Sequence, residues 1–415
     1  MDVTPLLQWF WDNHRDLPWR KDRTPYSTWI SEAMLQQTRV TTVLDYYPRF
    51  LKRFPTPSDL ASATEDEVFK LWEGLGYYSR ARNLMRGAAY ICEHFDGNLP
   101  SDPDLLLEIP GIGPYMAGAI ASLAFDRAVP AVDGNCIRIY SRIFALPLVP
   151  SERSTYNEIY SRVLGDIPSE NPGDFNEALM DLGSLICTPK SPRCSICPFA
   201  STCSACLLGK QEDFPLKKPK KETPVEDHTI LKIYVGDRIL VRKRPAKGLL
   251  AGLFELIDLP GSLTASDVAA WLSENLLDEN LLDSSSPTSG AASATHAHSA
   301  TASRKSAQSA RESDAPSLDI RPLGGAHHVF SHLRWNMLGY EIHLPEVSAK
   351  ADKKNQAAKS DPSSQTTKAA KSDLSSKAIN AAKSDTAARA ESLGRLVTPE
   401  EYDQLAFASA IRAYR

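Results

Sequence analysis

Four cysteines lie close together in the segment 187–203 and constrain how this part of the chain can fold. Their spacing is C-x6-C-x2-C-x5-C, at Cys187, Cys194, Cys197 and Cys203. Prolines stiffen the loop between them, so four thiolates can converge on one metal centre. Tetrahedral sulfur ligation suits an iron–sulfur cluster or zinc, but zinc ribbons usually separate two C-x2-C pairs by about a dozen residues or more. The spacing therefore favours a cubane cluster over zinc, and a disulfide pair or reduced bystander cysteines are the alternatives.

Length and composition set the broad class. With 415 residues, 42% of them hydrophobic, the chain can bury a large core, and its length predicts two or three domains. No apolar run approaches the roughly 20 residues of a membrane span, and Met1 is not followed by a signal-peptide pattern. The odd cysteine count and the metal-type spacing indicate a reducing cytosol. The net charge of −4 gives no global sign of nucleic-acid binding, although a basic face can coexist with acidic tails.

Helical patterns dominate the first half of the chain. Three stretches are long enough for amphipathic or buried helices: 30–54, 65–95 and 115–125. Proline and glycine breakers separate them. The composition then changes to the proline- and lysine-rich sequence FPLKKPKKE, which is typical of a linker. We therefore expect a helical domain over 1–213 and a linker over 214–227.

The remainder, 228–415, reads as a separate α+β domain. Short β-type runs predict its strands at 229–235, 238–242, 254–259, 329–331 and 336–344. Two polar tracts interrupt this domain, one rich in Ser, Ala and Thr over 284–316 and one rich in Ala, Lys and Ser over 346–392. The second tract repeats AAKSD but has too few apolar residues to build a core. We expect both tracts to be disordered insertions.

The sequence LEIPGIGP at 107–114 directly precedes an apolar helical run and predicts a tight hairpin between two helices. The glycines Gly111 and Gly113 let the backbone approach a phosphate closely, with amide groups pointing outward at a helix N-terminus. Such a contact to the DNA backbone does not depend on base sequence. An ordinary Gly/Pro turn between helices is the alternative.

A carboxylate follows the hairpin in the small-residue sequence AVDGN at 131–135. A single aspartate such as Asp133 is more often a helix N-cap or a turn residue than a catalyst. The order of hairpin, aspartate and cysteine loop is much more specific than any of the three parts.

This order resembles the helix-hairpin-helix DNA glycosylases of the endonuclease III superfamily and, within it, the adenine DNA glycosylase (MutY) family. Further matches occur in the right order: RDLPWR at 15–20, WISEAMLQQT at 29–38, GLGYYSR at 74–80, VDGN at 132–135, NEAL at 176–179 and FSH at 330–332. The resemblance covers nearly all of the chain except the two polar tracts. It implies a multidomain protein, in which an all-α helix-hairpin-helix glycosylase domain with a [4Fe-4S] cluster loop at 187–203 precedes an α+β nudix-like domain.

The resemblance implies a base-excision-repair enzyme that hydrolyses the N-glycosidic bond of adenine. Its expected partner is double-stranded DNA that contains adenine mispaired with 8-oxoguanine or guanine. Relatives that also cut the strand carry a lysine after the hairpin, which forms a Schiff base with the sugar. Tyr115 occupies that position here, so we expect a monofunctional glycosylase.

By resemblance, Glu32 is the acid that protonates adenine, and Asp133 stabilises the oxocarbenium ion or attacks it, as in the two-carboxylate mechanism of glycoside hydrolysis. These roles need a raised pKa for Glu32 and an ionised Asp133. The resemblance assigns the orientation of sugar, water and carboxylates to Tyr115 and Asn135. A solvated charge on a helix is the alternative for Glu32.

Other residues are expected to contact the substrate, and by resemblance Trp19, Arg20 and Glu177 line the adenine pocket. The alternatives are core packing for Trp19, a surface ion pair for Arg20 and a helix-surface charge for Glu177. By resemblance, Gln37 is the residue wedged into the base stack beside the lesion, and Tyr78 is a second wedge beside 8-oxoguanine, in keeping with the stacking capacity of aromatic rings. The neighbouring Tyr77 is expected to be structural.

The cysteine loop is expected to hold a [4Fe-4S] cluster with a structural role, because hydrolysis needs no electrons. Lys190 and Arg193 beside it can present positive charge to phosphates. Cys206, which follows Cys203 closely, is assigned to the linker and not to the ligand set.

In the second domain, the FSH sequence resembles the loop with which the family recognises 8-oxoguanine, so we expect the same role here. The Ser331 hydroxyl can pair with the N7–H that oxidation creates and that guanine lacks. A strand end is the alternative for this tripeptide. The nudix catalytic box with its cluster of glutamates is absent from the sequence, so we do not expect nucleotide hydrolysis.

Two other functions compete with this interpretation. A glycosylase/lyase for oxidised pyrimidines is opposed by Tyr115 at the lysine position and by the whole second domain. A non-catalytic binder of damaged DNA predicts the loss of one carboxylate, whereas Glu32 and Asp133 are both present. We therefore expect an enzyme that is a monomer in the cytoplasm, associated with the bacterial nucleoid and with no membrane partner.

Overall fold

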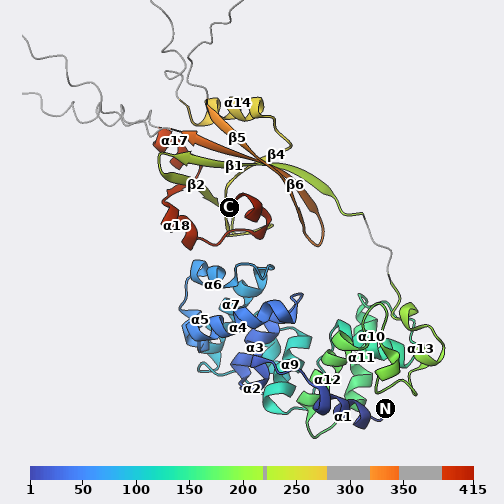
Figure 1. Cartoon of the computed structure of the whole chain (residues 1–415). Helices are drawn as coiled ribbons and strands as arrows, with labels where there is room; N and C mark the ends of the chain where they lie inside the picture. Colours follow the sequence, from blue (N-terminus) through green and yellow to red (C-terminus); the bar gives the residue numbers. More distant parts are fainter. Residues whose placement is uncertain (218–221, 278–317, 345–385) are drawn as a thin grey trace, which may run out of the picture. The chain divides into compact units, whose positions relative to one another are not determined.

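The computed structural model of the chain describes residues 1–217, 222–277, 318–344 and 386–415 (Figure 1). The chain divides into two compact units, Met1–Glu222 and Thr223–Arg415. The first unit is helical and the second is built on a mixed sheet, which confirms the predicted order of an all-α and an α+β region. In the described part of the chain, no helix has the length and apolar character needed to cross a membrane.

The first unit contains two helical lobes and two short 3-10 turns. Its elements are α1 (Thr4–Asn13), α2 (Pro18–Lys21), α3 (Pro25–Leu35), α4 (Val40–Arg53), α5 (Pro57–Ala61), α6 (Glu65–Trp72), α7 (Ser79–His94), α8 (Pro103–Glu108), α9 (Pro114–Phe125), α10 (Gly134–Ile143), α11 (Arg153–Asp166), α12 (Pro172–Leu185), η1 (Cys194–Ile196), α13 (Ser204–Leu207) and η2 (Gln211–Asp213).

Helix α3 is the central helix of one lobe. A capping box between Thr24 and Ser27, with Pro25 in the first turn, fixes where the helix begins. Every residue from Tyr26 to Met34 is buried, because α4, α7 and α9 pack around the helix. A charged residue on such a helix is necessarily taken out of water.

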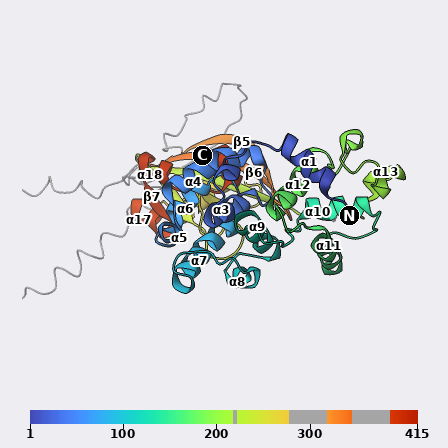
Figure 2. The same cartoon turned by 90° about the horizontal axis from the view of Figure 1, so that it is seen from below.

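The second lobe combines the beginning and the end of the unit. Side chains of α1, α10, α11 and α12 share one hydrophobic core with the cysteine loop, including Phe10, Tyr140, Phe175 and Phe199. Figures 1 and 2 show these helices and α13 gathered in one group. The cysteine loop is therefore packed directly on the helices that follow Asp133.

Two long predicted helices are each interrupted in the structure. The stretch 30–54 breaks between α3 and α4, and the stretch 65–95 breaks between α6 and α7. Gln37 in the first break and Tyr77 in the second have positive φ values of 56° and 48°. A left-handed residue cannot continue an α-helix. Gln37 directly follows the C-cap residue of α3, and after α6 the first residue with a positive φ is Gly74, at 105°.

The second unit contains a sheet in the order β3-β2-β1-β6-β5, with β4 paired to β1 and β7 paired to β2. Strands β1 and β6 run parallel along their full lengths, and the other pairs are antiparallel. The elements are β1 (Val225–Val235), β2 (Arg238–Lys243), β3 (Phe254–Glu255), β4 (Ile257–Pro260), α14 (Ala265–Asn275), β5 (Asp319–Val329), β6 (Arg334–Leu344), α17 (Thr386–Leu393), β7 (Arg395–Val397), α18 (Pro399–Gln404) and η3 (Ser409–Tyr414).

Both faces of this sheet are covered. Helices α14 and α17 pack on one face through Val268, Leu272 and Ala390. The C-terminal α18 and η3 cover the other face through Tyr402, Ile411 and neighbouring apolar residues. Figure 1 shows α14 and the C-terminal segment on opposite sides of the strands.

Some predicted boundaries need correction. The expected linker 214–227 ends inside β1, which begins at Val225. The second polar tract was expected to extend to residue 392, but α17 starts at Thr386 and buries Ala387 and Ala390, because these small residues pack against the sheet. The rest of that tract, and the whole of 284–316, lie outside the described residues. The predicted strand 329–331 is the end of the longer β5, and Phe330 and Ser331 lie in the turn after it.

Candidate active site

A pocket of about 720 Å³ opens between the two lobes of the first unit. One wall comes from α2, α3 and the loop after α3, and the other comes from the starts of α9 and α10 and from α12. The pocket brings together eight of the predicted site residues: Trp19, Arg20, Glu32, Gln37, Tyr115, Asp133, Asn135 and Glu177.

Glu32 is the buried acid of this pocket. Its side chain leaves the last turns of α3, and the residue is only 5% exposed. The pKa of Glu32 is raised to about 7, mainly by burial. A hydrogen bond from Tyr115 and the Arg20 charge lower this pKa, and the negative charges of Glu177 and Asp133 add to the increase. Near neutral pH, a substantial fraction of Glu32 therefore carries a proton. The predicted direction of its pKa shift is confirmed.

Tyr115 holds the Glu32 carboxylate. Its hydroxyl donates to Oε2 of Glu32 over 2.5 Å and also lies 3.8 Å from the sulfur of Met180. Burial and the nearby charge of Glu32 raise the pKa of Tyr115 well above its ordinary value, so the phenol stays protonated and acts as a donor. Because Tyr115 stands in the first turn of α9, the hairpin before this helix sets its position.

Asp133 faces the same pocket as the N-cap of α10. Its Oδ1 accepts from the backbone amide of Cys136 over 2.8 Å, and its Oδ2 accepts from the side-chain amide of Asn135 over 2.7 Å. Burial raises its pKa, while these hydrogen bonds and the Arg138 charge lower it. The N-cap alternative for Asp133 is thus correct, and it is compatible with a place in the pocket.

Asn135 connects Asp133 to the cysteine loop. Its Oδ1 accepts from Nη2 of Arg138 over 2.8 Å, and Nε of Arg138 donates to the carbonyl of Cys187 over 2.8 Å. A Cβ atom on Gly183 would lie 2.5 Å from Cβ of Asn135, so α12 needs a glycine where it passes this side chain. One turn later on α10, Nη1 of Arg142 lies 3.3 Å from Sγ of Cys187.

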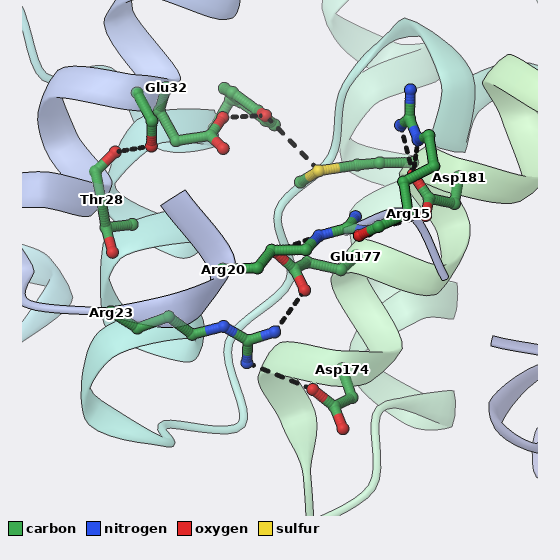
Figure 3. Close-up of polar contacts among 11 residues, drawn as sticks. Arg15, Arg20, Arg23, Thr28, Glu32, Asp174, Glu177 and Asp181 are labelled. Atoms are coloured by element: carbon green, nitrogen blue, oxygen red, sulfur yellow. Dashed lines mark hydrogen bonds and ion pairs between the residues drawn. The ribbon is translucent and has the colours of Figure 1, made fainter. Parts of the chain in front are cut away.

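A network of arginines and carboxylates forms the far wall (Figure 3). Arg20 pairs with Glu177 at 3.1 Å and with Asp181 at 2.9 Å, and Arg23 pairs with Glu177 at 2.5 Å. Arg15 completes the network by pairing with Asp181. Burial raises the pKa of Glu177 although both arginines lower it, whereas at Asp181 the arginines outweigh burial and lower the pKa. The surface alternatives for Arg20 and Glu177 are wrong, because both side chains are buried in this network.

Arg23, Met180 and Asp181 also belong to this wall, although the sequence motifs did not indicate them. Asp181 lies four residues after Glu177 on α12, so a helical projection places the two carboxylates on one face. That spacing was the available signal. Trp19 lines the pocket and is also 6% exposed, with its ring at 5.5 Å from Tyr47, so it has both of the roles considered for it.

The hairpin lies between α8 and α9. Gly111 has a φ of +89°, which favours glycine, and a Cβ there would lie 2.5 Å from Cβ of Asn83. Gly113 is the exposed N-cap residue of α9 and meets no atom where a Cβ would be. Both glycines thus present open backbone beside a helix N-terminus.

Comparison with known proteins agrees with this arrangement. Residues 30–163 match the HhH-GPD superfamily of base excision DNA repair proteins. An adenine DNA glycosylase of Rattus norvegicus is 34% identical over 392 residues, which cover 82% of this chain and 70% of the relative. The chain belongs to the adenine DNA glycosylase family.

Other members of the family show similar or narrower coverage. The adenine DNA glycosylase of Buchnera aphidicola (subsp. Schizaphis graminum) is 36% identical over 274 residues, which cover 66% of this chain and 78% of the relative. The enzyme of Arabidopsis thaliana is 40% identical over 290 residues, but the match spans only 46% of its length. Membership makes the chain a glycosylase of base-excision repair.

Within this family member, the two adjacent tyrosines differ from expectation. Tyr78 is 6% exposed and its ring packs at 5.1 Å from Phe69, so it cannot enter a base stack without leaving the core. Tyr77 is 47% exposed in the left-handed backbone conformation described above. The assignment of the wedge to Tyr78 is therefore wrong, and Tyr77 is the tyrosine that solvent reaches. Gln37 is exposed, as a wedge requires.

The cysteines of the segment 187–206 lie around one small cavity. Cys187, Cys194, Cys197 and Cys203 line it together with Arg142, and none of them forms a disulfide. Cys206 lies in α13 and lines the same cavity, so it belongs to the loop and not to the linker. Across the described ranges, no three His, Cys, Asp or Glu side chains are arranged to hold a metal ion.

In the second unit, Ser331 lies in the exposed turn between β5 and β6. Its hydroxyl is 3.4 Å from Nδ1 of His332, and the ring of Phe330 packs at 5.1 Å from Trp335. Phe330 thus anchors the turn on Trp335, while Ser331 beside it is exposed.

Proposed function

We propose that this glycosylase removes adenine paired with 8-oxoguanine or guanine from double-stranded DNA and leaves the strand intact. The observation that carries the proposal is the pocket in which a carboxyl group with a pKa of about 7, Glu32, faces a second carboxyl group, Asp133. The names of the relatives support adenine in DNA as the substrate.

The reaction requires a base outside the duplex. An adenine must rotate out of the stack, at a cost of a few kcal/mol, before an enzyme can reach its glycosidic bond. The pocket offers a polar wall, where Arg20 and Arg23 hold the Glu177 carboxylate in one orientation. A fixed acceptor of this kind suits the amino edge of adenine.

Glu32 supplies the proton. Adenine leaves well only when it is protonated, and a buried acid that holds its proton near neutral pH can give it to N7 of the base. The electron pair of the glycosidic bond then stays with the neutral adenine. Water adds to the sugar, and its proton returns to the Glu32 carboxylate.

Asp133 serves the sugar. As the glycosidic bond breaks, positive charge develops on the ring, and a carboxylate held by Asn135 and by the amide of Cys136 stabilises this cation or attacks it. Tyr115 supports the absence of lyase chemistry, because a phenol that donates to Glu32 cannot form the Schiff base that strand cleavage needs.

The cysteine loop fits an iron–sulfur cluster by its chemistry. Four free thiols share one cavity, and the Arg142 guanidinium lies 3.3 Å from the sulfur of Cys187, where it can donate a hydrogen bond to a cluster ligand. We propose that Cys187, Cys194, Cys197 and Cys203 hold a [4Fe-4S] cluster, which would cross-link the loop. No step of the reaction depends on it.

The DNA contacts follow from exposure. Gly111 and Gly113 offer backbone amides to a phosphate, and Gln37 and Tyr77 offer side chains to the base stack. For the opposite base, we propose that the nudix-like second unit reads 8-oxoguanine through the Ser331 hydroxyl, which can accept from the N7–H of the oxidised base.

A single-turnover assay tests the proposal. Excess enzyme is mixed with duplexes that carry adenine opposite 8-oxoguanine, guanine or thymine, and each sample is analysed with and without alkali. We expect excision opposite 8-oxoguanine and guanine, and strand breaks only after alkali. Equal rates opposite thymine would contradict the specificity, and breaks without alkali would contradict the monofunctional reaction. Ser331→Ala should narrow the difference between 8-oxoguanine and guanine.

A further inference from the structure

Arg80 is a buried arginine in the first turn of α7 that the mechanism does not use. Its residue is 8% exposed, and its guanidinium nitrogens lie within hydrogen-bond distance of six oxygen atoms. Nη1 is 2.8 Å from the carbonyls of Ala33 and Met34 and 2.6 Å from that of Gln36. Nη2 is 3.1 Å from Oγ1 of Thr38, 3.0 Å from the carbonyl of Leu75 and 3.1 Å from that of Gly76.

These acceptors belong to the two segments that interrupt the predicted helices. The first is the end of α3 and the loop after it, which also lines the pocket, and the second is the loop between α6 and α7. One guanidinium therefore joins two loops that are about 40 residues apart in the sequence.

Each loop displays one exposed non-glycine residue in a left-handed conformation, Gln37 in the first and Tyr77 in the second. Arg80 binds Gln36 and Thr38, the residues on either side of Gln37. It also binds Gly76 before Tyr77, its backbone amide donates to the carbonyl of Tyr77 over 2.9 Å, and its guanidinium lies 5.7 Å from the tyrosine ring. A left-handed backbone is unfavourable for a non-glycine residue, so both conformations need support from their surroundings.

The charge of Arg80 does not serve as a phosphate contact. Burial lowers its pKa to about 10, so the guanidinium stays charged at neutral pH, but its nitrogens are directed to protein oxygens instead of solvent. The planar guanidinium has enough N–H donors, in fixed directions, to reach the carbonyl oxygens that surround it. A lysine ammonium has three donors at one point and cannot reach both groups of acceptors in the same way.

We propose that Arg80 is a positioning residue that fixes Gln37 and Tyr77 relative to each other, so that both side chains enter the DNA base stack together. This inference rests on the proposed DNA contacts of these two residues. Arg80 would then couple the positions of Gln37 and Tyr77. Its guanidinium makes no hydrogen bond to a side-chain polar atom of these two residues or of the catalytic carboxyl groups.

A double-mutant cycle in the full-length protein tests this role. The probe is a duplex with a 2′-fluorinated, excision-resistant adenosine opposite 8-oxoguanine and 2-aminopurine as its neighbour, whose fluorescence reports unstacking. The variants are Arg80→Lys, the pair Gln37→Ala with Tyr77→Ala, and all three changes together. Arg82→Met is the matched control on the same helix, where the guanidinium pairs with Glu65 at 2.5 Å.

We expect Arg80→Lys to reduce the unstacking equilibrium about tenfold, the scale of one lost charge-assisted hydrogen bond. The same change should have no further effect once Gln37 and Tyr77 are alanine, because Arg80 acts through them. Arg82→Met should unstack DNA like the unmodified protein. Binding to an undamaged duplex and the melting temperature are measured in parallel, because a merely structural role would change these and leave the two effects additive.

Two results separate the possible failures. If Gln37→Ala with Tyr77→Ala leaves unstacking unchanged, the proposed DNA contacts of these residues are wrong. If that pair impairs unstacking but the Arg80→Lys effect is additive with it, the contacts stand and the positioning role of Arg80 is overturned. Should Arg80→Lys lower the folded fraction, the cycle is run below its melting temperature, where additivity decides in the same way.

Discussion

Glu32 joins function and stability in one side chain. The same burial in α3 that lets it hold a proton near neutral pH also makes its ionised form unfavourable in the folded protein. Tyr115 limits this effect by donating a hydrogen bond, but it does not abolish it. We therefore predict two pH dependences for this residue, and both the excision rate and the stability should fall as the pH rises.

The first concerns the rate. A general acid works while it is protonated, and the pKa of Glu32 lies at about 7. We expect the single-turnover excision rate to fall as the pH rises through about 7. The rate is measured between about pH 6 and pH 9 at saturating enzyme, and a rate that stays flat or increases over this range would rule out Glu32 as the proton donor.

The second concerns folding. The pKa of Glu32 is about 7 in the folded state, above the ordinary glutamate value of 4.5 that applies to the unfolded chain, so the folded protein binds the proton more tightly. The stability is then fully present below the unfolded value and decreases by roughly 3 kcal/mol as the pH rises to about 7. Glu32→Gln removes this loss, so it should raise the melting temperature at pH 8 more than at pH 5. Equal changes at both pH values would contradict the raised pKa.

At the scale of elements, α10 ties the pocket to the cysteine loop. Its N-cap is Asp133, Asn135 stands in its first turn, and Arg138 and Arg142 bind the backbone of Cys187 from successive turns. The orientation of the Asp133 carboxylate in the pocket thus depends on how α10 packs on α12. Gly183 leaves the space on α12 that the side chain of Asn135 occupies.

Gly183→Ala tests this packing. The new Cβ would lie 2.5 Å from Cβ of Asn135, so the two helices must separate and Asp133 must shift with Asn135. We expect the excision rate to fall at least about tenfold and the stability to fall by about 1–3 kcal/mol. Gly165→Ala on α11 is the control, because a Cβ there meets no atom within 4 Å. An unchanged excision rate in Gly183→Ala would show that Asn135 does not position Asp133.

The cysteine loop gives a prediction about metal content. If the four thiolates hold a cubane cluster, the purified chain should contain about four irons and as many inorganic sulfides, and should absorb visible light. Cys197→Ser should lose most of this iron and lower the melting temperature, whereas Cys92→Ser, whose thiol lies in α7, should keep it. One zinc per chain and no sulfide would contradict the cluster.

At the scale of the whole molecule, the proposed function assigns chemistry to one compact unit and recognition of the opposite base to the other. The first contains the pocket and the proposed phosphate and stacking contacts, and the second displays Ser331 on a turn of a covered sheet. Ser331→Ala should therefore change the preference for the opposite base and leave the chemistry at Glu32 intact.

Much of this organisation could be predicted from the sequence. Motif order gave the helical region before the α+β region, and Glu32, Tyr115 and Asp133 share one pocket as expected. The choice between Tyr77 and Tyr78 could not be made, because two adjacent tyrosines have the same chemistry and only the packing of Phe69 decides which ring is buried. The pairing of Arg23 with Glu177 joins residues 154 positions apart, and nothing local to either residue indicates it.

In the proposed reaction, the buried carboxyl group of Glu32 donates the proton that allows adenine to leave. The most direct test of this step compares the unmodified chain with Glu32→Gln in single-turnover excision of adenine opposite 8-oxoguanine, after both proteins are shown to bind the duplex equally. We expect the excision rate of the variant to be lower by about 100-fold or more, and its decrease above about pH 7 to disappear. A Glu32→Gln protein that excises adenine within a few-fold of the unmodified rate would contradict this role of Glu32.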